Sequence, residues 1–277
     1  LPTDIYSTLP IAYTAKHTNY ETVDELRLIY GMNLDYLYGE DANLNGILDP
    51  NENDGDDLPP HDNKDSRLDS GILDFVTVWT HEPNVISNGI SRVAVTDLTT
   101  LSNFFATNFP ALKPTWSAFA TTPPTNVLDF YVRSQMSASD FQEAEPFLMN
   151  AQTNGLVNVN TATATALSCV LNSTNLAAQI LNYRQSTPPV VASITWVKDA
   201  VGSDQTTINE IGQYLTAFTF QYTADVAAVG HNGRGYRRVR FVFDTSSGVP
   251  QIIYRQDLTH LGWALGKTVR DELALNN

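Results

Sequence analysis

The chain has 277 residues, which is enough for one large or two small domains; 42% of them are hydrophobic and 17% are charged. This composition excludes a disordered acidic polymer, and no apolar run approaches the roughly 20 residues that a membrane-spanning helix requires. The single cysteine, Cys169, excludes an intrachain disulfide. The net charge is −14, and an acidic surface repels phosphate, so we expect no nucleic-acid partner.

The N-terminal third is predicted to contain one short helix, one long polar loop and one strand. Residues 22–31 begin with Thr22, which can cap a helix, and end with Gly31, which can terminate one. A polar loop follows over residues 39–70. The β-branched and aromatic residues of segment 71–80 are typical of a strand.

The rest of the chain is helical first and then strand-forming. Residues 95–181 predict several short helices separated by prolines. Three alternating segments then predict an antiparallel meander, at residues 215–224, 235–243 and 250–255. Sheet segments on both sides of a helical middle predict an α+β fold in which the helical region is inserted into the sheet or packed beside it.

The polar loop carries much of the negative charge, because residues 40–74 include 11 acidic and only 2 basic side chains. Residues 41–52 place oxygen-bearing side chains at loop positions 1, 3, 5, 9 and 12, with Gly46 at position 6. This spacing matches the calcium-loop pattern D-x-[DN]-x-[DN]-G-x5-E through its final glutamate. The predicted ligands are the backbone carbonyl of Ile47 and the side chains of Asp41, Asn43, Asn45, Asp49 and Glu52.

The alternative for this loop is a solvated acidic segment. The loop has no histidine or cysteine, so its oxygen donors favour Ca²⁺, with Mg²⁺ second. Pro50 and the polar residues after Glu52 predict an EF-hand-type loop without the flanking helices. A second ion could be supplied by later carboxylates, although they satisfy no spacing rule and could equally be solvated: Asp54, Asp56, Asp57, Asp62, Asp65 and Asp69.

Catalytic motifs are absent from the sequence. The five histidines show no paired metal-ligand spacing, and neither a nucleophile-elbow pattern nor a Walker loop occurs. A pair of glycosidase carboxylates needs no local motif and remains the minor enzymatic alternative. Four arginines on the predicted hairpin, Arg234, Arg237, Arg238 and Arg240, are interpreted as a solvated strand face that pairs with nearby acids, with an anion or partner site as the alternative.

Three separated motifs stand out in the chain. The first motif lies at residues 20–32 and is followed by residues 36–39 and the calcium-type loop. The second pairs N-V-N-T-A at 158–162 with A-x-x-I-x-x-x-R at 177–184, and the third covers the strand-like residues 236–243 and 253–254. Together these motifs resemble the minor pseudopilin K family of type II secretion systems, over roughly residues 20–260.

The resemblance implies a pilin-like antiparallel sheet with a large inserted helical domain. It divides the chain into a segment 1–94 with helix, calcium loop and strand, a mainly helical domain 95–212, and C-terminal strands 213–277. It also implies a non-enzymatic protein that binds calcium through the six loop residues and caps a pseudopilus tip to assist protein export. The implied partners are minor pseudopilins I and J, in the periplasm, with inner-membrane anchoring through a hydrophobic N-terminal helix that is absent from this chain.

Two other classes remain open at this point. Residues 158–162 also resemble the helix-hairpin-helix DNA-binding modules of competence proteins, but residues 172–175 lack the glycine of that hairpin and the net charge is unfavourable. The loop would also suit a calcium-stabilised extracellular interaction module. Two consecutive loops would be expected in such a module, and the sequence has one.

Overall fold

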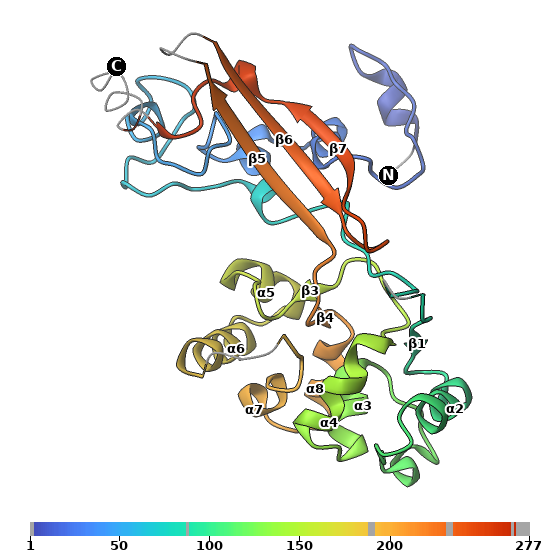
Figure 1. The fold of residues 1–277 in the computed structure, drawn as a ribbon. Coiled ribbons are helices and arrows are strands. Elements are labelled where there is room, and N and C mark those ends of the chain that lie inside the picture. The colour runs from blue at the N-terminus through green and yellow to red at the C-terminus, as the bar shows by residue number, and fades with distance from the viewer. Residues whose placement is uncertain (1–2, 87–88, 188–191, 231–234, 267–268, 270–277) are drawn as a thin grey trace. The chain divides into compact units, whose positions relative to one another are not determined.

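The structure, a computed structural model, describes residues 3–86, 89–187, 192–230, 235–266 and 269. The chain divides into two compact units (Figure 1). Unit 1 comprises Leu1–Val78, Thr223–Val242 and Tyr254–Asn277, and unit 2 comprises Trp79–Tyr222 and Phe243–Ile253. Most of unit 2 is therefore one insertion, in chain order, between two parts of unit 1. The predicted segments 1–94, 95–212 and 213–277 stay a prediction.

Unit 2 is mainly helical, as predicted. Six of its helices begin at a residue whose side chain accepts a hydrogen bond from a backbone N–H of the first turn, which fixes where each helix starts. The helices are α2 (Leu98–Asn108), α3 (Val127–Ser134), α4 (Ala138–Ala144), α5 (Ala164–Leu171), α6 (Thr174–Ser186), α7 (Val197–Val201) and α8 (Gln205–Gly212). Two short 3₁₀ helices accompany them, η5 (Trp116–Phe119) and η6 (Glu145–Phe147).

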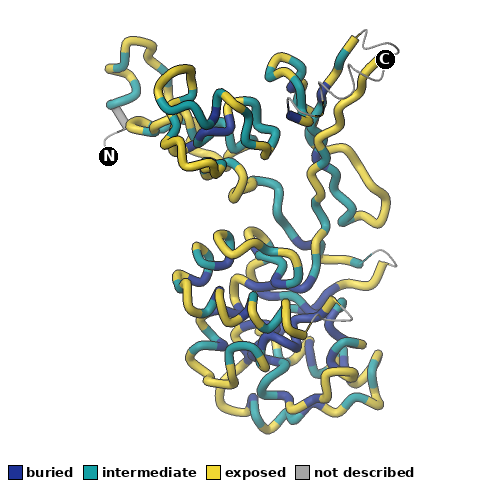
Figure 2. The backbone as a smooth tube through the Cα atoms, turned by 90° about the vertical axis from the view of Figure 1, so that its left-hand side faces the viewer, coloured by how far each residue is buried: buried dark blue, intermediate teal, exposed yellow. Residues whose placement is uncertain are grey.

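Two pairs of very short parallel strands link these helices. Strand β1 (Val93–Ala94) pairs with β2 (Leu148–Met149), and β3 (Val157–Asn158) pairs with β4 (Leu215–Thr216). Many of the buried residues lie in unit 2 (Figure 2), and the large cluster of buried apolar side chains belongs to this unit.

Aromatic side chains form the centre of this core. Phe130 is fully buried, and its ring lies 5.4 Å from that of Phe119, 5.7 Å from that of Phe105 and 6.3 Å from that of Phe141. Aromatic pairs at such separations add to the stabilisation that burial provides. The helical unit therefore has a core of its own.

The two parts of the second sequence motif meet in unit 2. Arg184, near the end of α6, donates hydrogen bonds of 2.9 Å to the carbonyl oxygens of Val159 and Ala162. Between α5 and α6, Asn172 adopts the left-handed conformation at φ 48°, which asparagine tolerates better than most residues. The motif thus describes a packed helix pair whose turn does without glycine.

Unit 1 holds the remaining short helices and most of the sheet. Its helices are η1 (Thr3–Thr8), η2 (Val23–Leu28), α1 (Leu34–Tyr38), η3 (Pro50–Glu52), η4 (Ile72–Asp74) and η8 (Thr259–Leu261). The sheet has the order β5–β6–β7, with β5 (Gln221–Val229), β6 (Tyr236–Asp244) and β7 (Gln251–Asp257). The three predicted C-terminal strands are confirmed, with the first split into β4 and β5, and the unit boundary falls within β5, β6 and β7.

Two predictions for the N-terminal third need correction. The helix after Thr22 is a 3₁₀ helix over Val23–Leu28, and the Thr22 side chain makes no capping bond. The strand predicted at 71–80 is wrong, because Ile72–Asp74 form a 3₁₀ helix and no ladder continues through residues 75–80. Phe75 and Val76 are 39% and 44% exposed, so these residues lack the packing that gives β-formers their preference for strands.

The α+β class is confirmed as helices plus a small antiparallel sheet, while the pilin-like character of that sheet stays a prediction. Among the described residues, no helix combines the length and the apolar composition that a membrane span needs.

Candidate cation site

The acidic loop is closed at its base. Gly39 and Ser70 form an isolated antiparallel bridge, so the loop has the bounds that the sequence predicted. Gly71 lies so close to Leu37 that a Cβ atom would be 2.3 Å from the Leu37 carbonyl oxygen. The buried carboxylate of Glu40 accepts hydrogen bonds of 3.2 Å from the amides of Asn63 and Asp69.

Asp41 shapes the first turn of the loop. One of its carboxylate oxygens accepts a hydrogen bond of 3.0 Å from the Asn45 amide, and the other accepts one of 2.8 Å from the Gly46 amide. Gly46 has φ 71°, a conformation that glycine adopts without steric cost. Asp41 is 2% exposed, and burial raises the pKa of its carboxyl above the usual value although these amides oppose the shift.

Glu52 joins the two ends of the loop. Its carboxylate accepts 3.0 Å and 2.9 Å hydrogen bonds from the amides of Ala42 and Asp49. Glu52 is 1% exposed, and burial raises the pKa of its carboxyl, with the negative charges of Asp41 and Asp49 adding to the rise. The loop therefore holds neighbouring carboxylates at a position where their negative charge is poorly compensated.

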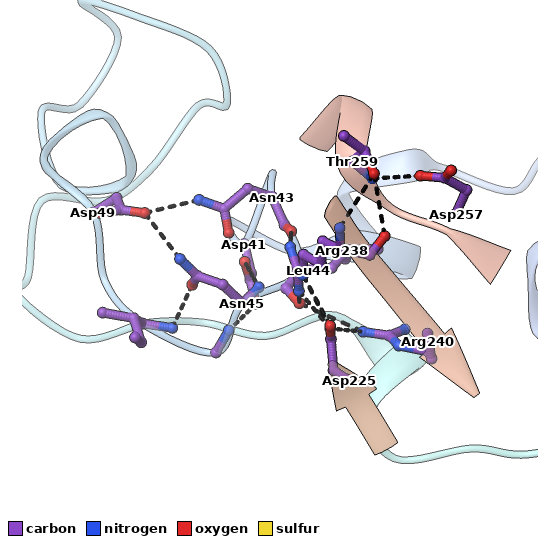
Figure 3. Close-up of polar contacts among 12 residues, drawn as sticks. Asp41, Asn43, Leu44, Asn45, Asp49, Asp225, Arg238, Arg240, Asp257 and Thr259 are labelled. Atoms are coloured by element: carbon purple, nitrogen blue, oxygen red, sulfur yellow. Dashed lines mark hydrogen bonds and ion pairs between the residues drawn. The ribbon is translucent and has the colours of Figure 1, made fainter. Parts of the chain in front are cut away.

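The two asparagines face Asp49 (Figure 3). Their amide nitrogens lie 2.7 Å (Asn43) and 3.1 Å (Asn45) from the Oδ2 atom of Asp49. The Oδ1 atom of Asn45 accepts a 2.7 Å hydrogen bond from the Ile47 amide. The Oδ1 atom of Asn43 is buried and has no hydrogen-bond partner among the described residues. An unpartnered buried oxygen is costly unless something else satisfies it.

The loop borders a cavity of about 370 Å³. Within unit 1, this cavity is lined by Asn43, Asp49 and Asp54 from the loop and by Trp263 from the C-terminal segment. A space of this size gives water and ions access to the side chains that face it.

All six predicted ligands lie in this loop, and hydrogen bonds join the five side chains among them to one another or to the loop backbone. Their donors are oxygens, and the unpartnered Asn43 oxygen is available, so the set fits a hard cation such as Ca²⁺. However, within the chain that the structure describes, no three or more His, Cys, Asp or Glu residues gather into a group able to hold a metal ion. Calcium binding therefore stays a prediction.

Two of the carboxylates suggested for a second ion have hydrogen-bond partners within the loop. Asp62 accepts hydrogen bonds from the amides of Asp54, Gly55 and Lys64 at 2.7–3.0 Å. Asp56 lies 3.0 Å from the Nδ1 atom of His61. The second ion also stays a prediction.

Sequence reasoning missed the side chain that joins this loop to the sheet. Arg238 is 1% exposed, so its placement on a solvated strand face is wrong. Arg237, by contrast, is exposed and forms the expected ion pair with Asp257 at 2.8 Å. Arg234 lies outside the described residues. The two-residue period of the strand is the signal that could have identified Arg238, because it shares a face of β6 with the buried Val242.

The comparisons with known proteins give one finding. No family model matches the chain, and no curated protein matches it. Among solved structures it is similar to one chain of the crystal structure of the GspK-GspI-GspJ complex from the type 2 secretion system of enterotoxigenic Escherichia coli. The identity is 14% and the TM-score 0.29, over 56% of this chain and 54% of that one.

The matched structure comes from a type 2 secretion system, the same kind of system as that of the family the sequence motifs resemble. The chain spans about half the length of the chain it matches.

Proposed function

We propose that this chain is a calcium-binding minor pseudopilin that acts by assembly and turns over no substrate. It joins two smaller minor pseudopilins, I and J, at the tip of a type II secretion pseudopilus and assists protein export from the periplasm. In this proposal a hydrophobic N-terminal helix anchors the subunit in the inner membrane. The observation that carries the proposal is the Asp41–Glu52 calcium-type loop, placed directly behind the first of three family-like motifs in one chain.

The arrangement of the chain supports this proposal. The helical unit 2 is inserted between two parts of unit 1, and unit 1 holds both the loop and much of the C-terminal sheet. The motif at 158–162 and Arg184 are joined by hydrogen bonds, so the second motif describes one packed structure. A helical insertion in a sheet-bearing subunit is the architecture that the motif resemblance implies.

The loop geometry supports calcium as its ligand. Asp41 and Glu52 are almost fully buried, Asp49 faces both asparagines, and the Asn43 oxygen has no partner in the described structure. The side chains of Asp41, Asn43, Asn45, Asp49 and Glu52 and the carbonyl of Ile47 would hold the ion. A bound calcium supplies positive charge among these oxygens and fixes the loop.

Titration calorimetry with Ca²⁺ tests the metal part of the proposal. The wild-type chain is expected to bind one ion with measurable heat, and Glu52→Gln is expected to weaken binding because it removes a charge from the closing ligand. At a hundredfold excess over Kd, the ion should stabilise the folded protein by about 2.7 kcal/mol in thermal unfolding.

The matched control is Asp56→Asn. This substitution removes the same charge from the same acidic loop, at a side chain that is 90% exposed and is not one of the six ligands proposed for the first ion. Calcium affinity should be nearly unchanged in this control. An absence of binding to the wild type, or equal affinity in wild type and Glu52→Gln, would refute the ligand assignment.

A further inference from the structure

A buried arginine on β6, Arg238, contacts the calcium-type loop of residues 41–52, which we call the cation loop. It does so from the side opposite to the side-chain amides of Asn43 and Asn45 (Figure 3). The Nη1 atom of Arg238 donates to the carbonyl oxygen of Asn43 at 2.6 Å, and its Nη2 atom donates to that of Leu44 at 2.5 Å. Arg238 and the cation loop both belong to unit 1, although Arg238 lies 195 positions after Asn43 in the chain. One guanidinium thus binds two successive peptide units of the loop.

The turn that Arg238 binds has an unusual backbone. Leu44 has φ 54°, in the left-handed region, which a residue with a Cβ atom adopts at a cost. The two hydrogen bonds from Arg238 compensate this cost by fixing the carbonyls on either side of the Leu44 Cα atom. The same turn determines where the Asn43 and Asn45 side chains point, and both point to Asp49.

Asp225 on β5 holds the guanidinium in place. Its carboxylate accepts hydrogen bonds from the Nε atom of Arg238 at 3.0 Å and from its Nη2 atom at 2.6 Å. Such a two-point contact fixes the orientation of the guanidinium plane as well as its position. The nearby Arg240 adds weaker contacts, at 3.5 Å to Asp225 and 3.4 Å to the Leu44 carbonyl oxygen.

Asp225 also affects the charge near the proposed ion. A guanidinium next to a cation site disfavours the cation by like-charge repulsion. The adjacent carboxylate offsets that charge, so the arginine can orient the loop with less repulsion of the ion. Groups that orient ligands without touching the metal commonly change metal affinity by about 10- to 100-fold when they are altered.

We propose that Arg238 and Asp225 form a positioning pair that holds the Asn43–Asn45 turn in its ligand-presenting conformation. The pair links the cation loop to strands β5 and β6. The effect on calcium affinity rests on the proposed function, whereas the effect on the conformation of the turn does not.

The principal test is Arg238→Lys, which keeps the positive charge but cannot contact two carbonyls and a carboxylate in one plane. Its control is Arg237→Lys, the adjacent residue on the same strand, which is 72% exposed and pairs with Asp257. We expect Ca²⁺ affinity, measured by calorimetry, to fall by about 10- to 100-fold in Arg238→Lys and to stay within twofold of wild type in the control.

A second variant, Asp225→Asn, tests the same pair if Arg238→Lys does not fold. Asp225→Asn changes a side chain that is 28% exposed, and Asp257→Asn is its control on β7. We expect the Asp225→Asn variant to lose Ca²⁺ affinity and Asp257→Asn to retain it. Circular dichroism in the presence of a chelator establishes that each variant used is folded.

The second readout needs no calcium. Hydrogen exchange of the Asn45 and Gly46 amides, which donate to Asp41, should be faster in calcium-free Arg238→Lys than in calcium-free wild type. If the wild type binds no calcium but these amides exchange faster in Arg238→Lys than in wild type, the positioning pair is supported and the calcium assignment is wrong. Folded Arg238→Lys and Asp225→Asn proteins with wild-type exchange at both amides would overturn the positioning pair, whatever their calcium affinity.

Discussion

Glu145 makes the stability of the helical unit depend on pH. It lies at the start of η6 and is 2% exposed. Its carboxylate accepts a 2.5 Å hydrogen bond from the Ser193 hydroxyl and one of 2.8 Å from the Ile194 amide. Burial raises the pKa of Glu145 from 4.5 to about 7, and the negative charge of Glu82 adds to the rise.

The hydrogen bonds to Glu145 and the positive charge of Arg92 oppose this rise without cancelling it. Arg92 binds other groups instead of Glu145: it forms a 2.6 Å ion pair with Glu82 and donates a hydrogen bond to the carbonyl oxygen of Leu148. Among the described residues, Glu145 is therefore left without a close cation of its own.

The sign of the effect follows from proton binding. Between pH 4.5 and about 7 the folded protein binds more protons at Glu145 than the unfolded chain does, so its stability falls as pH rises through this window. At about 1.4 kcal/mol for each pH unit, the loss is about 3 kcal/mol. Glu145→Gln keeps an oxygen for the Ile194 amide and removes the ionisable group, so it should remove this loss.

Urea unfolding of wild type and Glu145→Gln at pH 5 and pH 8.5, followed by tryptophan fluorescence, measures this difference. Subtracting the two proteins at each pH cancels the other titrating groups. The free energy of unfolding of Glu145→Gln, relative to that of wild type, should increase by about 2–3 kcal/mol from pH 5 to pH 8.5. Glu143→Gln, an exposed change in α4, should gain almost nothing. An equal stability difference at both pH values would show that Glu145 does not cause the pH dependence.

Two substitutions test the packing of the same unit. Phe130→Ala removes the ring at the centre of the aromatic core and should lower the free energy of unfolding by about 3–5 kcal/mol in denaturant unfolding. Its control, Tyr36→Ala, changes a side chain that is 71% exposed and should alter that free energy by less than about 0.5 kcal/mol. Similar losses in the two variants would contradict the placement of Phe130 in the core. Gly212→Ala would place a Cβ atom 2.1 Å from the Asn126 oxygen that caps α3, so it should lower the thermal unfolding temperature, and an unchanged temperature would contradict that contact.

Local signals explain what the sequence could predict. The helices of unit 2 follow from capping residues and apolar spacing within each segment, as at Asp97 before α2 and Ser173 before α6. The loop bounds and the calcium-type spacing are also local. The strands β6 and β7 follow from alternation within ten residues.

Contacts between distant segments explain the remainder. Residues 71–80 have the composition of a strand, but only a neighbouring strand elsewhere in the chain could have made them one, and the described structure has no β-ladder through residues 75–80. The burial of Arg238 depends on Asp225 from another strand and on two carbonyls about 195 residues earlier. The two-residue period of β6 places Arg238 on the face of the buried Val242, but it does not identify the acceptors that Arg238 binds.

Light scattering tests the proposed assembly of this chain with two smaller subunits. The sample is an equimolar mixture of this chain with the soluble domains of minor pseudopilins I and J from the same system, in Ca²⁺. We expect one stable species with the mass of a one-to-one-to-one complex. Three separate monomers at tens of micromolar would contradict the proposed assembly.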